Sequence, residues 1–314
     1  RNRWRETGMR AALLLGATTL SVAAGYRLVR LMAGTSRVGV DERFGALSIG
    51  ASQLVLASAR RLAVAFELNP ILAGHLVVAP RRCVQRVNEL DDAEYDELWR
   101  CVRQAQVLAE GRRAGSRASN LLLKEGVGDA PLHVHVVPRT GPADFERDDQ
   151  VFDELYSWVP LPGVSPTPKD KLEVPPDSAR RDRSAEQMAA EAATYRGLCN
   201  DLSPGCGKPA TAHAFSKFPI ASEQIFYTSP SGLTCAFVNL RPLANGHVLV
   251  TPRRIVPRIG MLTDEEYEDL WRSVRDVQKI VEAATGASQS ELGVQDGREA
   301  GQSVPHVHVH VLPH

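Results

Sequence analysis

Residues 262–282 read LTDEEYEDLWRSVRDVQKIVE, and residues 90–110 read LDDAEYDELWRCVRQAQVLAE. The later stretch predicts a helix, because Thr263 with Glu266 three residues on forms a capping box and apolar residues recur at helical spacing. The face that they form comprises Tyr267, Leu270, Trp271, Val274, Val277 and Val281. A helix repeated this closely indicates two copies of one structural unit.

The correspondence continues on both sides of the repeated helix. Each helix lies between short apolar or alternating runs, such as HVLVTP before the second helix and HVHVHVLP after it, and such runs are typical of strands. Strands that flank a long helix predict an α+β unit with a mainly antiparallel sheet. The matched positions outside the helix are Gly74-His75 with Gly246-His247, Pro80-Arg81-Arg82 with Pro252-Arg253-Arg254, and His133-Val134-His135 with His308-Val309-His310.

The tandem duplication predicts four parts. Between the copies the chain is rich in proline and charge, as linkers are, and Ser184 with Gln187 then opens a short alanine-rich helix. We expect the copies to pack together as an intramolecular pseudo-dimer, because a lone copy would expose a sheet edge. The parts are a basic segment at 1–40, a first copy at 41–158, a linker at 159–212 and a second copy at 213–314.

The composition is that of a packed globular protein, with 43% hydrophobic and 24% charged residues among 314. Lys plus Arg and Asp plus Glu number 37 each, so no overall positive field favours nucleic acid as a partner. The five cysteines are too few and too scattered for a disulfide framework. Cys199 and Cys206, followed by His213, fit no common zinc spacing, so loop cysteines are the simpler interpretation, and their pairing stays open.

The first forty residues are rich in arginine and poor in acid, and residues 11–26 carry no charge. A helix of that run would be roughly 24 Å long against a hydrocarbon core of ~30 Å, but apolar flanks and snorkelling arginines extend it. We expect one hydrophobic helix over about residues 9–32 that acts as a membrane anchor, with a mitochondrial membrane favoured. An organellar targeting peptide and a surface helix are the alternatives.

Three histidines near the end of the chain, His306, His308 and His310, alternate with valines. In a strand this alternation places the three imidazoles on one face at ~7 Å steps. A zinc site with three histidine ligands and a nucleophilic histidine supported by its neighbours are the two functional interpretations. An exposed polar strand face is disfavoured, because such faces usually draw on Thr, Ser and Lys.

The motif HVHVHVLP resembles the signature of the histidine triad family, and QDGREAGQSVPHVHVHVLP at 295–313 is similar to its fragile histidine triad branch, the dinucleoside polyphosphate hydrolases. FVNLRPLANGHVLVTPRR at 237–254 also resembles that branch. The resemblance covers roughly 44–158 and 215–314. It implies an antiparallel sheet with a long helix, normally in a homodimer whose sheets join. It favours the nucleophile over the zinc site, so we expect no metal and no cofactor.

The resemblance implies roles for residues of the second copy. His308 matches the nucleophile that attacks the α-phosphorus and carries the nucleotidyl intermediate, and a neutral imidazole near pH 7 suits both half-reactions. The other matched positions orient this ring (His306 and His247), donate to phosphate (His310 and Ser303), orient nucleophile and water (Gln302), contact the leaving-group side (Gln295) and contact the ribose (Asn239).

The first copy departs from this pattern. Pro131 replaces the first histidine, Lys124 replaces Gln295, and the following loop is shorter. Glu67 falls at the position of Asn239, where a carboxylate would repel a phosphate-bearing ligand. We therefore expect one functional site, in the second copy, and one degenerate site, in the first. The second copy also stops at His314, without the segment that follows the triad in the first copy, and we expect this to affect substrate choice.

The expected function is that of a membrane-tethered nucleotide phosphoester hydrolase or nucleotidyl transferase. Its partners would be a nucleotide or dinucleoside polyphosphate and a membrane, with no nucleic acid. The alternative is a structural or regulatory accessory subunit of a mitochondrial membrane complex, recruited from the histidine triad family.

Overall fold

The computed structural model describes residues 42–60, 62–125, 130–147, 149–160, 172, 175, 177–203 and 212–314. Within it, Glu42–His314 form one compact unit. The helix expected over residues 9–32 lies outside the described residues. Among the helices that are described, none combines the length and the apolar character needed to span a bilayer.

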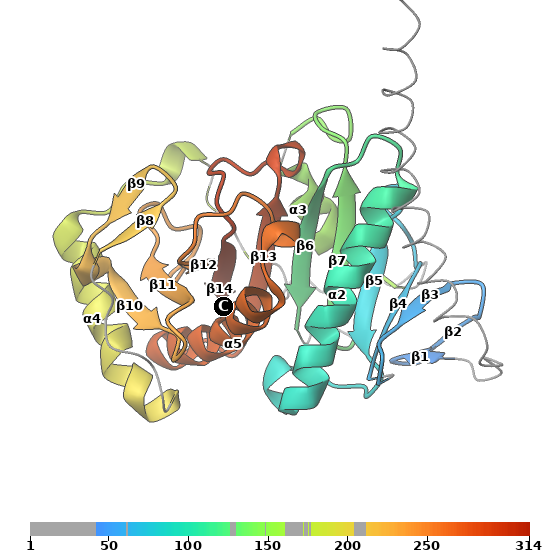
Figure 1. Ribbon diagram of the computed structural model, residues 1–314, viewed down its shortest axis with the longest axis horizontal. Helices are drawn as coiled ribbons and strands as arrows, with labels where there is room; N and C mark the ends of the chain where they lie inside the picture. The colour runs from blue at the N-terminus through green and yellow to red at the C-terminus, as the bar shows by residue number, and fades with distance from the viewer. Residues whose placement is uncertain are drawn as a thin grey trace, which may run out of the picture. The chain divides into compact units, whose positions relative to one another are not determined.

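Ten strands form one antiparallel sheet in the order β10-β11-β12-β14-β13-β6-β7-β5-β4-β3 (Figure 1). This confirms the predicted α+β class with antiparallel strands. The first copy supplies β3 (Leu54–Ala57), β4 (Ala63–Phe66), β5 (Leu76–Pro80), β6 (Ala118–Lys124) and β7 (His133–Arg139). The second copy supplies β10 (Ile225–Thr228), β11 (Thr234–Val238), β12 (Val248–Pro252), β13 (Ser290–Asp296) and β14 (Val309–Pro313). Two-stranded hairpins precede them, namely β1 (Glu42–Phe44) with β2 (Leu47–Ile49), and β8 (His213–Phe215) with β9 (Phe218–Ile220).

The two repeated helices, α2 (Asp92–Arg112) and α5 (Asp264–Thr285), cover one face of the sheet (Figure 1). The predicted capping box is confirmed, because the Thr263 hydroxyl accepts from the Glu266 N–H. The valines of the HVHVHV motif belong to the core cluster beneath these helices, so the histidines face the other way. The shorter helices are α3 (Gln150–Tyr156), η1 (Val87–Glu89), η3 (Asp177–Ala179), η4 (Ser222–Gln224), η5 (Ile259–Met261) and η6 (Arg298–Ala300).

The alanine-rich helix of the linker forms as predicted. It is α4 (Ala185–Leu202), and the Ser184 side chain caps it by accepting from the Gln187 N–H. This helix packs on α5 and on β10. The described end of the linker is therefore part of the compact unit, attached to the second copy.

The two copies share the sheet through β13 and β6, which pair from Leu292 opposite Leu123 to Asp296 opposite Ser119. On the helix face, the Trp99 and Trp271 rings stack with centroids 3.3 Å apart. Both tryptophans are buried, as expected of core residues. The contacts around them are reciprocal: the Tyr95 hydroxyl donates to the Trp271 carbonyl at 2.7 Å, and the Tyr267 hydroxyl donates to the Trp99 carbonyl at 2.6 Å.

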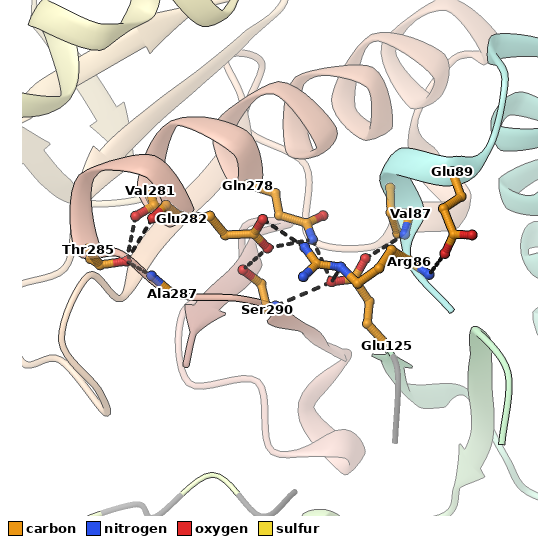
Figure 2. Close-up of polar contacts among 10 residues, drawn as sticks. All are labelled: Arg86, Val87, Glu89, Glu125, Gln278, Val281, Glu282, Thr285, Ala287 and Ser290. Carbon is orange, nitrogen blue, oxygen red and sulfur yellow. Dashed lines mark hydrogen bonds and ion pairs between the residues drawn. The ribbon is translucent and has the colours of Figure 1, made fainter. Parts of the chain in front are cut away.

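A largely buried polar network also crosses from one copy to the other (Figure 2). The Glu125 carboxylate of the first copy accepts from Gln278 Nε2 at 2.9 Å and from the Val87 N–H at 2.5 Å, and Arg86 bonds Glu282 at 2.8 Å. Burial raises the pKa of Glu125, and the Val87 N–H and the charge of Arg86 oppose that rise. The counterpart with the copies exchanged comprises Asp296, Gln106, Ile259, Arg258 and Glu110.

Candidate active site

The His308 ring is held so that one nitrogen is free to react. Its Nδ1 lies 2.7 Å from the His306 carbonyl oxygen and donates to it, which leaves the lone pair on Nε2. Within the described residues this Nε2 has no hydrogen-bond partner. The Phe215 ring meets the imidazole edge-on, with centroids 5.2 Å apart, and burial lowers the pKa of His308 to about 4. The ring is therefore a neutral base near pH 7.

A chain of hydrogen bonds fixes the proton on His310. The Leu243 N–H donates to Nδ1 of His247 at 2.9 Å, so His247 carries its proton on Nε2. That Nε2 donates to Nδ1 of His310 at 2.9 Å, and His310 in turn presents an Nε2–H. Burial lowers the pKa of His247 to about 3 and that of His310 well below its usual value, so both rings are neutral. His310 can thus donate a hydrogen bond without carrying charge.

His306 is a supporting residue with both nitrogens engaged. Its Nε2 donates to the Pro252 carbonyl at 2.8 Å, and its Nδ1 accepts from the Ser216 N–H at 3.2 Å. Ser216 takes a left-handed conformation, with φ at 56°, in the turn of the β8–β9 hairpin. Neither Ser216 nor Phe215 was predicted as a site residue, and only their closeness to the hairpin turn could have indicated them.

Gln302 lies beside the His308–His306 pair. Its Nε2 donates to the His306 carbonyl at 3.3 Å, the same oxygen that receives Nδ1–H of His308. Its Oε1 accepts from the Gly297 N–H at 3.2 Å, which fixes the amide orientation. The role of Gln302 in orienting His308 stays a prediction, and these two bonds fix where its amide lies.

The three residues expected to bind substrate differ in their contacts. Asn239 joins the histidine network, because its Nδ2 donates to the acceptor Nδ1 of His247 at 3.3 Å and its Oδ1 accepts from the Arg241 N–H at 3.0 Å. Gln295 is half-buried on β13, and Ser303 is exposed in the turn before β14. In the described structure, neither of these two side chains bonds the other predicted residues.

The linker reaches this site, which the sequence analysis did not predict. The Arg183 N–H donates to the Leu240 carbonyl at 2.9 Å, and Arg183 Nε donates to the Asn239 carbonyl, also at 2.9 Å. Glu191 of α4 forms an ion pair with the same guanidinium. The positive charge of Arg183 contributes to the lowered pKa of His247, after burial. In the sequence, only the cluster of arginines just before α4 could have indicated that the linker contacts the site.

The first copy keeps the histidine chain but closes it on itself. His75 Nε2 donates to His135 Nδ1 at 3.0 Å, as in the second copy, and His133 Nδ1 donates to the Pro131 carbonyl at 2.7 Å. However, Nε2 of His135 lies 3.0 Å from Nε2 of His133. The His135 proton therefore occupies the lone pair that a nucleophile would need.

Two other side chains fill the first site. The Trp158 ring lies against both histidines, with centroids 4.7 Å from His135 and 5.4 Å from His133. Lys124 is buried at 2% exposure, and its Nζ donates to the Leu155 carbonyl at 3.0 Å. A ligand entering this site would have to displace both side chains.

The placement of Glu67 at the position of Asn239 is wrong. The Glu67 carboxylate bonds Arg112 at 2.8 Å, at the end of the helix on the opposite face of the sheet. The strand register explains this: Phe66 lies opposite Val77, so the next residue along the strand points to the helix side. Leu68 packs on the histidine side instead. The first site is closed by apolar packing and not by a repelling carboxylate.

No three His, Cys, Asp or Glu side chains of the described residues are arranged to hold a metal ion. His213 lies in β8 with its ring centroid 5.8 Å from that of His306. Cys199 Sγ donates to the Phe226 carbonyl at 3.2 Å. Cys206 lies outside the described residues, so its pairing with Cys199 stays open.

Comparisons with known proteins identify a family for both copies. The HIT domain family matches the chain twice, at residues 51–141 and 221–314. Bis(5'-nucleosyl)-tetraphosphatase (asymmetrical) of Schizosaccharomyces pombe is 56% identical over 99 residues, which are 32% of this chain and 53% of that protein. Bifunctional bis(5'-adenosyl)-triphosphatase/adenylylsulfatase FHIT of Arabidopsis thaliana is 48% identical over 103 residues, 33% of this chain and 56% of that protein.

Among solved structures, the C. elegans NitFhit protein is 42% identical, with a TM-score of 0.33, over 35% of this chain and 26% of that one. The chain spans about half the length of the yeast and plant relatives. The two family matches lie one in each copy of the repeat. The chain therefore belongs to the HIT domain family, as a tandem duplication related to its fragile histidine triad branch.

Proposed function

We propose that the chain is a nucleotide phosphoester hydrolase that cleaves dinucleoside polyphosphates at the second copy, with His308 as nucleophile. The observation that carries this proposal is the state of the His308 ring, whose Nδ1 is bound to the His306 carbonyl and whose Nε2 is free. The names of the relatives, a bis(5'-nucleosyl)-tetraphosphatase and a bifunctional bis(5'-adenosyl)-triphosphatase/adenylylsulfatase, support the substrate class.

In the first half-reaction Nε2 of His308 attacks the α-phosphorus, a nitrogen–phosphorus bond forms, and the bond to the bridging oxygen breaks. The other nucleotide leaves with that oxygen. Positive charge then develops on the imidazole, and the hydrogen bond from Nδ1 to the His306 carbonyl stabilises it. The Nε2–H of His310 and the amide of Gln302 are placed to donate to phosphoryl oxygens or to the entering water.

In the second half-reaction water attacks the same phosphorus, and the nitrogen–phosphorus bond breaks. A nucleoside monophosphate leaves, the electron pair returns to Nε2 of His308, and the water proton passes to solvent. If an alcohol or phosphate enters in place of water, the same step is a nucleotidyl transfer. A pKa of about 4 for His308 favours this cycle, because the ring regenerates its neutral form at pH 7.

The two copies are proposed to form an intramolecular pseudo-dimer. The exchanged contacts of the tyrosine and tryptophan pairs support this, since a two-fold interface places each contact twice. The proposed boundaries are 41–158 and 213–314 for the copies, with 159–212 between them and 1–40 before them. The first copy would then be the partner that a homodimer otherwise supplies.

We also propose a membrane tether over about residues 9–32, which the uncharged run at 11–26 and its arginine-rich flanks support. A mitochondrial membrane remains the favoured location. The accessory-subunit alternative stays a prediction.

The test is incubation of the purified full chain with diadenosine triphosphate and diadenosine tetraphosphate, with products separated by chromatography. Release of a nucleoside monophosphate together with the complementary nucleotide is expected. Rapid quenching and mass spectrometry should find the adduct on the peptide that carries His308. Equal turnover by the His308→Ala variant would overturn the proposal.

A further inference from the structure

The loop that carries Gln302 is bound by a side chain of the first copy. This loop, residues 297–302, closes on itself, because the Gln302 N–H donates to the Gly297 carbonyl at 3.2 Å. Asn120 of β6 crosses the boundary between the copies and donates from Nδ2 to the Ala300 carbonyl at 2.9 Å. Asn120, a residue of the degenerate first copy, therefore bonds the backbone two residues before Gln302, a predicted catalytic residue.

The Asn120 amide has a fixed orientation. It is fully buried, and its Oδ1 accepts from NH1 of Arg139 at 2.8 Å. Because an arginine can only donate, the amide oxygen must face Arg139 and the NH₂ group must face Ala300. Arg139 is fully buried as well, and its Nε donates to Asp144 at 3.2 Å. The buried Arg139–Asp144 pair thus fixes the Asn120 amide that donates to the loop.

Packing against β6 of the first copy also restrains this loop. Gly297 has a φ of 103°, and a Cβ built there would lie 2.8 Å from Cβ of Ala118, two residues before Asn120 on β6. A side chain at position 297 would therefore not fit between the loop and β6, so the loop lies close against the first copy. The hydrogen bond to Ala300 opposes movement in the other direction. Together the two contacts set the distance of the loop from β6.

We propose that Asn120 is a positioning residue for the working site. By fixing the loop at Ala300, it keeps the Gln302 amide at the His306 carbonyl, next to His308. This inference rests on the proposed function of the second copy. It gives the first copy a role in the reaction although its own histidines are closed off.

The test is the Asn120→Asp variant, which keeps the size of the side chain and its acceptor for Arg139 but removes the donor to Ala300. We expect kcat on a dinucleoside polyphosphate to fall about tenfold, with KM changed less than about twofold, because misplaced groups slow chemistry more than binding. Asn88→Asp makes the same chemical change at an exposed position of the same copy and should leave kcat unchanged. Asn120→Ala replaces Asn120→Asp if the carboxylate unfolds the chain.

A double-mutant cycle separates positioning from a general structural effect. In a Gln302→Ala background, Asn120→Asp should cause little further loss of kcat, since both changes remove the same aligned amide. If the two losses multiply instead, Asn120 does not act through Gln302, and the inference is overturned.

The rate of amide hydrogen exchange in residues 297–302, measured without nucleotide, reports the mobility of the loop independently of turnover. Faster exchange is expected in Asn120→Asp and not in Asn88→Asp. If the wild type shows no turnover while the loop loosens as expected, the proposed function fails and the loop contact stands. If the wild type is active and Asn120→Asp changes neither kcat nor exchange, the inference fails and the proposed function stands.

Discussion

In the first copy, Nε2 of His133 lies 3.0 Å from Nε2 of His135, so one ring donates its proton to the other. No such bond joins His308 and His310, the corresponding pair of the described second copy, whose ring centroids are 5.0 Å apart against 4.6 Å in the first. Both copies share the backbone bond that fixes Nδ1. The two sites therefore differ in the separation of these two rings, in addition to the Trp158 and Lys124 side chains that fill the first site.

Replacing His308 should abolish turnover, whereas replacing its counterpart His133 should leave turnover nearly unchanged. We expect His308→Ala to lower kcat about 10⁴-fold or more, because it removes the nucleophile. His133→Ala should change kcat less than about twofold, since its lone pair is already engaged. Steady-state hydrolysis measured on both variants tests this, with melting temperature as the control for folding. Comparable losses of kcat in both variants would contradict the assignment of one working site.

The acid limb of the pH profile should lie near pH 4. Burial lowers the pKa of His308 to about 4, so the nucleophile stays neutral between pH 7 and pH 5. We therefore expect kcat/KM to be nearly constant over that range. An acid limb near pH 6.5, the usual value for histidine, would show that His308 is more hydrated than its burial indicates.

Stability should fall in acid. His75, His133 and His247 have pKa values lowered to about 3 by burial, whereas the unfolded chain protonates near pH 6.5. The unfolded state thus binds more protons below pH 6.5, and each such group removes about 1.4 kcal/mol per pH unit as pH falls towards its folded pKa. Glu291 opposes this over pH 4.5 to 7, because its pKa is raised to about 7 by burial.

Urea unfolding at pH 7, 6 and 5 measures the balance. A declining free energy of unfolding is expected, since the buried histidines outnumber the raised carboxyl groups. A free energy that rises towards pH 5 would mean that the carboxyl groups dominate.

Removing a ring at the junction of the copies should destabilise both together. Trp99→Ala would cost about 3–5 kcal/mol, because it removes a buried ring stacked on Trp271. Tyr95→Phe, which removes only the hydrogen bond to the Trp271 carbonyl, should cost about 1 kcal/mol. Calorimetry should show one transition for both copies. Two separated transitions in the wild type would show that the copies unfold independently.

Carbonate extraction of native membranes tests the proposed tether. The full chain should remain in the membrane pellet, because a buried apolar helix resists alkaline extraction. Leu14→Arg, which places a charge within the uncharged run, should shift the chain towards the soluble fraction. Complete release of the wild type would rule the anchor out.

The sequence predicted those parts of the molecule that depend on local periodicity. Thr263, Glu266 and the apolar stripe define α5, and alternation in HVHVHV places the histidines on one face. Glu67 was misplaced because the segment from Phe66 to His75 is one residue shorter than the matching segment from Phe237 to His247. Sequence matching can put that gap on either side of a strand end, and a one-residue shift changes the face.

Contacts between distant segments left little trace in the sequence. Trp158 closes the first site from beyond α3, and Arg183 reaches the second site from the linker. Asn120 acts across the boundary between two strands of different copies. These contacts depend on tertiary arrangement, which neither composition nor spacing encodes.

The pairing of β6 with β13 inside one polypeptide has a consequence for inheritance. In a symmetric homodimer every substitution appears in both subunits, so a change that ruins one catalytic centre ruins both. A fused pair escapes this coupling: Pro131 and Lys124 could arise in one half while the other half kept all three histidines. Since the halves are tethered, their association also does not depend on protein concentration. Tandem duplication within one chain thus replaces a constraint of symmetry with freedom for the halves to diverge.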